Sequence, residues 1–115
     1  MRVTRVLNEA GEVVVERCSV ADKPWSRMRG LLGRDGLGSG EGLLLRPCGS
    51  VHTFFMRFPI DVVFLDRELG VVAVSPEVPP WRTARAKGAK VTLELTAGEA
   101  ARRRIAPGTQ LRLGS

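Results

Sequence analysis

Side chains that could do chemistry gather in one short stretch of this chain, residues 52–66. The stretch holds the single histidine, His52, together with all four phenylalanines, and Pro59 divides it into two extended runs. Asp61 stands near the head of the second run, where a buried carboxylate is costly without a partner. Arg57 can supply that partner if the chain folds back at the proline. We interpret the pair first as a structural strap at the bend, and alternatively as part of the floor of a ligand cleft.

A thiol and an imidazole also lie close together in the sequence, at Cys48 and His52. A neighbouring histidine can activate a cysteine as a nucleophile, and Asp61 would then orient the imidazole. Because nearness in sequence does not establish that geometry, a small hydrolase or transferase using Cys48 or His52 is an alternative hypothesis. The same three residues offer sulfur, nitrogen and oxygen ligands, but one histidine without paired cysteines makes a thin ligand set. We therefore predict no metal and no cofactor.

An aromatic ring and a forked cation, Trp81 and Arg82, follow the rigid dipeptide Pro79–Pro80. Such a pair suits a base, a sugar or a proline ring, although a tryptophan that fixes its own loop to the domain is commoner. Polar groups that converge beside apolar walls are typical of a small-molecule site. We therefore favour a non-catalytic module that binds a small anionic or carbohydrate-like ligand. The predicted ligand-binding residues are His52, Arg57, Asp61, Trp81 and Arg82.

Positive charge is abundant but dispersed. The chain has a formal net charge of +6 and a pI near 10.6, and its basic residues form three local groups at positions 27–34, 82–90 and 102–104. Dispersed charge attracts polyanions weakly. Aromatic residues make up 5% of the chain, tyrosine is absent, and no stacking motif of the common RNA-binding modules occurs. A nucleic-acid accessory role is thus a second alternative, less favoured than a small ligand.

Size and composition predict one ordinary globular domain spanning residues 1–115, with 43% hydrophobic and 26% charged residues. No apolar run approaches the length of about 18 residues that a membrane span needs, so we expect no membrane association. The N-terminus lacks the apolar region of a signal peptide, which predicts a cytoplasmic protein. In that compartment the two cysteines, Cys18 and Cys48, are expected to stay reduced.

Alternating and continuous apolar runs predict eight short strands. They cover residues 3–7, 13–17, 42–46, 51–56, 60–65, 71–74, 91–95 and 110–113, with 18–21 extending the second strand. The run 60–65 is apolar at both parities apart from Asp61, so we expect a core strand buried on both faces. Turn residues predict antiparallel hairpins at 8–12 and 66–70.

Two short helices complete the predicted fold. Pro24 suits the first position of a helix that would end near Gly33. Thr96 and Glu99 have the spacing of a capping box, which predicts a second helix through Arg104. Residues 75–81 are rich in proline and predict an irregular crossing, and 82–90 predict an exposed loop. The expected fold class is mainly β (α+β), a small β-sandwich or partly closed barrel.

Four ordered motifs carry a resemblance to a known family. They are Gly30-Leu31-Leu32-Gly33-Arg34, then Gly42-Leu43-Leu44-Leu45, then the run from Thr53 to Asp66, then Leu93-Glu94-Leu95-Thr96-Ala97-Gly98. In this order they resemble the prokaryotic family known as domain of unknown function 192. The chain departs from the usual pattern at Phe55, where many members have tryptophan, and at Phe58, where a Lys-Asn-Thr run is usual. The resemblance implies a compact, mainly β fold and no established activity.

Overall fold

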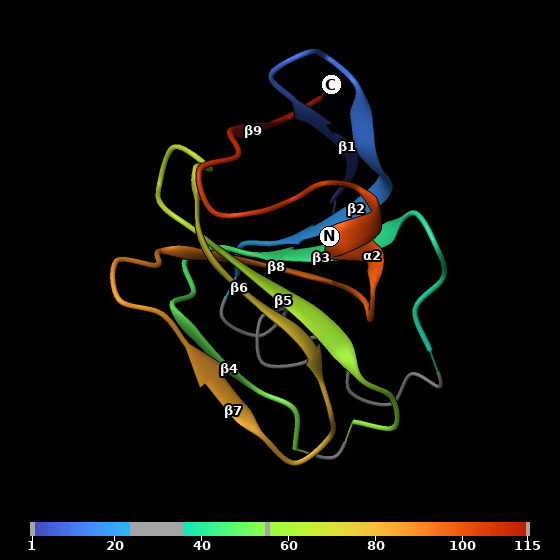
Figure 1. Ribbon diagram of the computed structural model, residues 1–115, viewed down its shortest axis with the longest axis vertical. Helices are drawn as coiled ribbons and strands as arrows, with labels where there is room; N and C mark the ends of the chain where they lie inside the picture. Colours follow the sequence, from blue (N-terminus) through green and yellow to red (C-terminus); the bar gives the residue numbers. More distant parts are fainter. Residues whose placement is uncertain (1, 24–35, 55, 115) are drawn as a thin grey trace.

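A curled, seven-stranded mixed sheet forms the body of the molecule (Figure 1). The computed structural model describes residues 2–23, 36–54 and 56–114. The strands of this sheet are β1 (Arg2–Asn8), β2 (Val13–Ala21), β3 (Glu41–Leu45), β5 (Ile60–Leu65), β6 (Val71–Val78), β8 (Val91–Thr96) and β9 (Leu111–Leu113). They lie in the order β6-β5-β8-β3-β2-β1-β9. Neighbours run antiparallel except for β2 and β3, which are parallel.

The two edges of the sheet approach each other at one end, which makes the fold a partly closed barrel. Gly70, just before β6, forms a bridge with Gln110, just before β9. Beside it, the Val71 amide donates to the Thr109 carbonyl at 2.9 Å, and the Leu111 amide donates to the Leu69 carbonyl at 3.0 Å. The predicted mainly β architecture is confirmed, as are the β1–β2 and β5–β6 hairpins.

Strand β5 is buried over its whole length, because apolar residues cover the sheet on both faces. All six of its residues are buried, and alternate side chains enter two different hydrophobic clusters. Val63 and Leu65 join a cluster under β9 and the short helix, and Val62 and Phe64 join the cluster on the other face. The prediction of a strand buried on both faces is therefore confirmed.

A separate two-stranded ribbon, β4 (Ser50–His52) with β7 (Thr83–Arg85), covers part of the second cluster. Val51 and Ala84 pack inward against that cluster, together with the half-buried Cys48. Figure 1 shows the ribbon at one end of the molecule, far from β1 and β9. Gly49 lets the start of the ribbon lie against the segment before β8, since a Cβ there would lie 2.8 Å from the Ala89 carbonyl oxygen.

The helix predictions need correction. The described residues contain one helix, α2 (Glu99–Arg102), which spans four residues, and the predicted helix 24–33 lies outside the described residues. The capping-box prediction is wrong, because the N-cap is Gly98, which has no side chain to cap the helix. The Thr96 hydroxyl instead donates to the Leu37 carbonyl at 2.5 Å, so a tertiary contact replaces the local one. In the described part of the chain, no helix is long and apolar enough to cross a membrane.

Three strand predictions also change. Strand β6 continues through Pro76 to Val78, where an irregular crossing was expected, because an edge strand tolerates a residue without an N–H. Residues 82–90 were predicted to be a loop, yet β7 lies within them and exists only through its pairing with β4. The strand predicted at 51–56 ends at His52, and the chain reaches β5 through turns and bends that end at Pro59.

Candidate functional site

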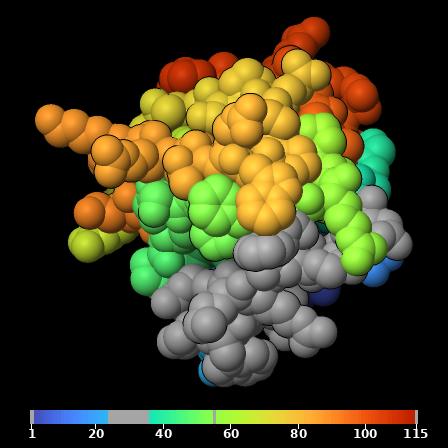
Figure 2. Space-filling model, turned by 90° about the horizontal axis from the view of Figure 1, so that it is seen from below, coloured from blue at the N-terminus to red at the C-terminus, as the bar shows by residue number. Residues whose placement is uncertain are grey.

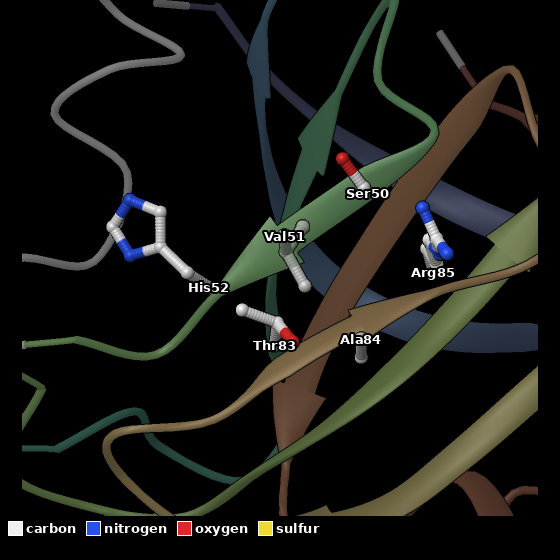
Figure 3. Close-up of a pocket in the computed structure, with 6 residues that line it drawn as sticks. All are labelled: Ser50, Val51, His52, Thr83, Ala84 and Arg85. Carbon is white, nitrogen blue, oxygen red and sulfur yellow. The ribbon is translucent and has the colours of Figure 1, made fainter.

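The β4–β7 ribbon presents one polar face to solvent and one apolar face to the core. Its strands pair Ser50 with Arg85, Val51 with Ala84, and His52 with Thr83. Because paired residues of antiparallel strands share a face, Val51 and Ala84 turn inward while the other two pairs turn outward. The outward residues are Ser50, His52, Thr83 and Arg85, and all four are exposed. Figure 3 shows them along the two strands.

A shallow groove follows this ribbon. Its volume is about 620 Å³, and its lining consists of Ser50, Val51, His52, Thr83, Ala84 and Arg85. A second hollow of about 550 Å³ shares Ser50 and Arg85 with the first and continues along the turn to Lys87. The two hollows therefore adjoin at Ser50 and Arg85, and their linings together run from His52 to Lys87.

Three aromatic rings stand in a row at the His52 end of the groove. The ring centroids of His52 and Phe54 are 5.0 Å apart, and those of Phe54 and Trp81 are 5.8 Å apart with an angle of 25° between the planes. Both separations are typical of interacting aromatic pairs. Phe54 is 37% exposed and Trp81 is 55% exposed, which is unusual for residues of this size. Figure 2 shows this end of the molecule, where the segments around β4 (green) and β7 (orange) lie side by side at the surface.

Buried Thr53 holds the aromatic row in place. Its hydroxyl donates to the Pro79 carbonyl at 2.7 Å and accepts from the Arg82 amide at 2.9 Å. Its main chain adds two more bonds, one from its own amide to the Arg82 carbonyl at 2.8 Å and one from the Trp81 amide to its carbonyl at 3.0 Å. Trp81 adopts a left-handed backbone with φ of 66°, a conformation that needs such support in a bulky residue. The Thr53 contacts thus fix Trp81 beside Phe54.

The electrostatic character of this end is positive. The segments that build it, residues 42–60 and 78–93, contain no aspartate or glutamate. They contain six arginines and lysines, namely Arg46, Arg57, Arg82, Arg85, Lys87 and Lys90. Arg85 lines both hollows, and exposed Arg82 follows Trp81 directly. A group of cations beside exposed rings favours an anion that also carries a ring.

Asp61 lies away from this face and has a structural environment. It is 1% exposed, and its carboxylate accepts main-chain N–H bonds from Glu77 at 2.9 Å, Gly98 at 3.1 Å and Ala100 at 2.8 Å. These bonds join β5 to β6 and to the start of α2 and offset the burial of the charge. Arg57 is exposed at the bend and lines neither hollow. We therefore assign Asp61 a role in the fold.

Cys48 and His52 point to different partners. The Cys48 thiol donates to the Ser50 carbonyl at 3.1 Å, and the side chain packs against the second core cluster. The His52 Nδ1 atom accepts from the Phe54 amide at 3.3 Å. The part of the chain that the structure describes thus shows no thiol–imidazole contact of the kind that activates a cysteine. Within the same residues, no cluster of three or more histidine, cysteine, aspartate or glutamate side chains is placed to hold a metal ion.

Of the five predicted ligand-binding residues, the structure brings His52, Trp81 and Arg82 to the ribbon. It leaves Asp61 in the core and Arg57 exposed at the bend, outside both hollows. Sequence reasoning missed Phe54 and Arg85. The available signal was strand parity, which puts Phe54 on the same side as His52, and Arg85 on the same side as Trp81. Thr53 was also missed, because its role depends on contacts with residues far along the chain.

Two buried glutamates lie outside the ribbon. Burial raises the pKa of Glu94, in the middle of β8, to about 7. Burial also acts to raise the pKa of Glu99, but the Ser39 hydroxyl, the Gly40 amide and the guanidinium groups of Arg102 and Arg103 together lower it. Glu99 therefore fixes the loop before β3 to α2 as a carboxylate, while Glu94 favours its neutral form in the folded protein.

Two solved structures have the same fold. A protein of unknown function from Novosphingobium aromaticivorans DSM 12444 matches with a TM-score of 0.81 and 24% identity, over 96% of this chain and 83% of that one. A putative transcription regulator from Sinorhizobium meliloti 1021 matches with a TM-score of 0.81 and 21% identity, over 96% of this chain and 92% of that one. At these identities the likeness shows the fold alone.

Sequence comparison shows the family. A UPF0127 protein of Thermococcus sibiricus is 36% identical over 93 residues, which cover 76% of this chain and 60% of that protein's length. The match thus spans less than two thirds of that relative. The model of the family DUF192, described as an uncharacterized ACR, matches residues 5–113. The chain therefore belongs to the DUF192 family.

Proposed function

We propose that this protein is a non-catalytic binding module that takes a small anionic ligand with a flat or sugar ring at the β4–β7 ribbon. The observation that carries the proposal is the exposed row of His52, Phe54 and Trp81 beside Arg82 and Arg85, in two segments that contain no acidic residue. The rings supply a surface for stacking, and the guanidinium of Arg85 supplies a fork for a carboxylate or a phosphate.

The architecture of the ribbon suits ligand binding better than catalysis. The groove is open and its rings are held by main-chain bonds and by Thr53, so the face is preorganised and loses little entropy when a ligand binds. Two large aromatic rings exposed on one face are typical of a surface that binds a partner. A ligand that spans the rings and Arg85 satisfies both features at once.

The test is a titration of the whole protein with small ring-bearing anions, using thymidine monophosphate and glucuronate as probes and isothermal calorimetry as readout. We expect one of them to bind, and Trp81→Ala to weaken that binding at least tenfold while Val3→Ala leaves it unchanged. Val3 is the matched control because it is also an exposed hydrophobic residue, 58% exposed, but lies on β1 at the other end. Equal affinities of the parent and Trp81→Ala would remove the proposal.

A further inference from the structure

The side chains of the ribbon end donate hydrogen bonds far more readily than they accept them. Residues 42–60 and 78–93 contain no asparagine or glutamine, in addition to having no aspartate or glutamate. Arginine and lysine donate only, so the hydroxyls of Ser50 and Thr83 and the imidazole are the side-chain acceptors along the groove. A neutral sugar needs acceptors for its many hydroxyl groups. The groove is therefore a poor match for such a sugar and a good match for a ligand rich in anionic oxygens.

The rings and the cations follow one another along the ribbon. Continuing the register of β4 and β7, Phe54 lies opposite Trp81, as the bonds between Thr53 and Arg82 require. Arg85 lies four residues after Trp81, and four residues of extended strand span about 13 Å. Lys87 lies further in the same direction, at the end of the second hollow. This track is longer than one ring with one charged group, and it suits a chain that repeats rings and anions.

We infer that the occupant of the ribbon is a single-stranded nucleic acid, whose bases stack on Phe54 and Trp81 while its phosphates meet Arg85 and Lys87. The inference rests on the proposed binding function and extends its ligand from one ring-bearing anion to a chain of such units. Exposed rings beside a cationic groove are how proteins hold single strands without reading sequence. A duplex hides its ring faces inside the helix, so the aromatic row favours a single strand. The amide and carboxylate side chains that read adenine and cytosine are absent from these segments, so we expect binding to discriminate little among bases other than guanine.

The experiment measures the affinity of the full chain for thymidine monophosphate, an oligothymidylate of about four residues, a duplex of the same charge, and polyphosphate, over a series of salt concentrations. We expect the oligothymidylate to bind at least tenfold more tightly than the monophosphate and the duplex. Trp81→Ala should weaken it about tenfold or more at every salt concentration, since stacking is worth about 1–3 kcal/mol per base. Trp81→Phe retains a stacking ring and should restore most of the affinity.

Replacing Arg85 should change the salt dependence of binding, which replacing Trp81 should not. Each phosphate contact with a single strand contributes about −0.7 to the slope of log affinity against log salt. Arg85→Ala should make that slope shallower, whereas Trp81→Ala should lower the affinity without changing the slope. Arg67→Ala is the matched control, because it removes the same charge from the exposed hairpin between β5 and β6 and should change neither quantity.

The outcomes separate the inference from the proposed function. If the monophosphate binds as tightly as the oligothymidylate, or if glucuronate binds and neither nucleotide does, the nucleic-acid inference is overturned and the small-ligand function stands. Equal binding of polyphosphate and oligothymidylate, unaffected by Trp81→Ala, also overturns the inference. If no ring-bearing anion binds, both are overturned.

Discussion

Replacing Thr53 by valine tests whether one buried hydroxyl positions the aromatic row. Valine has nearly the same shape, so the change removes two hydrogen bonds, to the Pro79 carbonyl and from the Arg82 amide, and little packing. Each bond contributes about 1 kcal/mol, and a polar group left buried without a partner costs more. We expect the free energy of unfolding to fall by about 2–3 kcal/mol, which corresponds to a drop in Tm of roughly 8–15 °C for a domain of this size.

Chemical denaturation gives the global loss, and amide hydrogen exchange locates it. The Arg82 amide loses its acceptor in Thr53→Val and should exchange faster than in the parent, while amides of β1 and β2 keep their protection relative to the new global stability. Thr83→Val is the matched control, because Thr83 is exposed on the outer face of β7 and should change stability by less than about 0.5 kcal/mol. A loss below about 0.5 kcal/mol for Thr53→Val, with normal exchange at Arg82, would refute the assigned role.

Three further changes test the rest of the structure. Asp61→Asn puts an N–H group where a carboxylate oxygen accepts from main-chain amides, so denaturation should show that the free energy of unfolding falls by about 2–4 kcal/mol. Stability equal to the parent would contradict the structural role of the Asp61 carboxylate. Gly49→Ala forces a Cβ to 2.8 Å from the Ala89 carbonyl oxygen, and we expect a lower Tm than for Gly36→Ala, where the space around an added Cβ is open and the backbone is not left-handed. The pKa of Glu94 is raised to about 7 from 4.5, so the unfolded chain releases its proton first and stability falls as the pH rises between these values, by up to about 3 kcal/mol. Glu94→Gln should remove that fall in stability and make the protein more stable than the parent at pH 8. Denaturation across the pH range measures this. If the free energy of unfolding of parent and variant changed with pH in parallel, the burial of this carboxyl group would be contradicted.

Where burial is decided by local pattern, the sequence predicts the fold well. Residues 60–65 are apolar at both parities, and β5 is buried on both faces as that pattern requires. The glycine at position 11 and the turn residues 66–70 predict the two antiparallel hairpins that form. In each case the signal lies within a few neighbouring residues.

Where structure depends on distant partners, the sequence gives little signal. Thr83–Arg85 has no strand pattern, and it is extended because β4 supplies its hydrogen bonds. Thr96 and Glu99 have the spacing of a capping box, but their side chains bind residues 37–40 instead. The local sequence allows several hydrogen bonds for such side chains, and the tertiary fold decides which of them form.

The candidate site shows the same division. Residue type indicated His52, Trp81 and Arg82, and the fold places them at one face through the pairing of two segments that are distant in sequence, as Val51 pairs with Ala84, 33 residues later. The cost of burying Asp61 was correctly anticipated, but the bonds that offset it come from main-chain amides of β6 and α2. Such amides carry no sequence signature, which is why side-chain reasoning looked to Arg57.

An NMR titration of the labelled protein with thymidine monophosphate tests the binding face most directly, because it reports both whether a ring-bearing anion binds and where. We expect the amide signals of residues 50–54 and 81–87 to shift together and saturate, and those of β1 and β9 to stay in place. Shifts centred on β1 and β9, or no shifts at any residue for this probe and for glucuronate, would contradict this expectation.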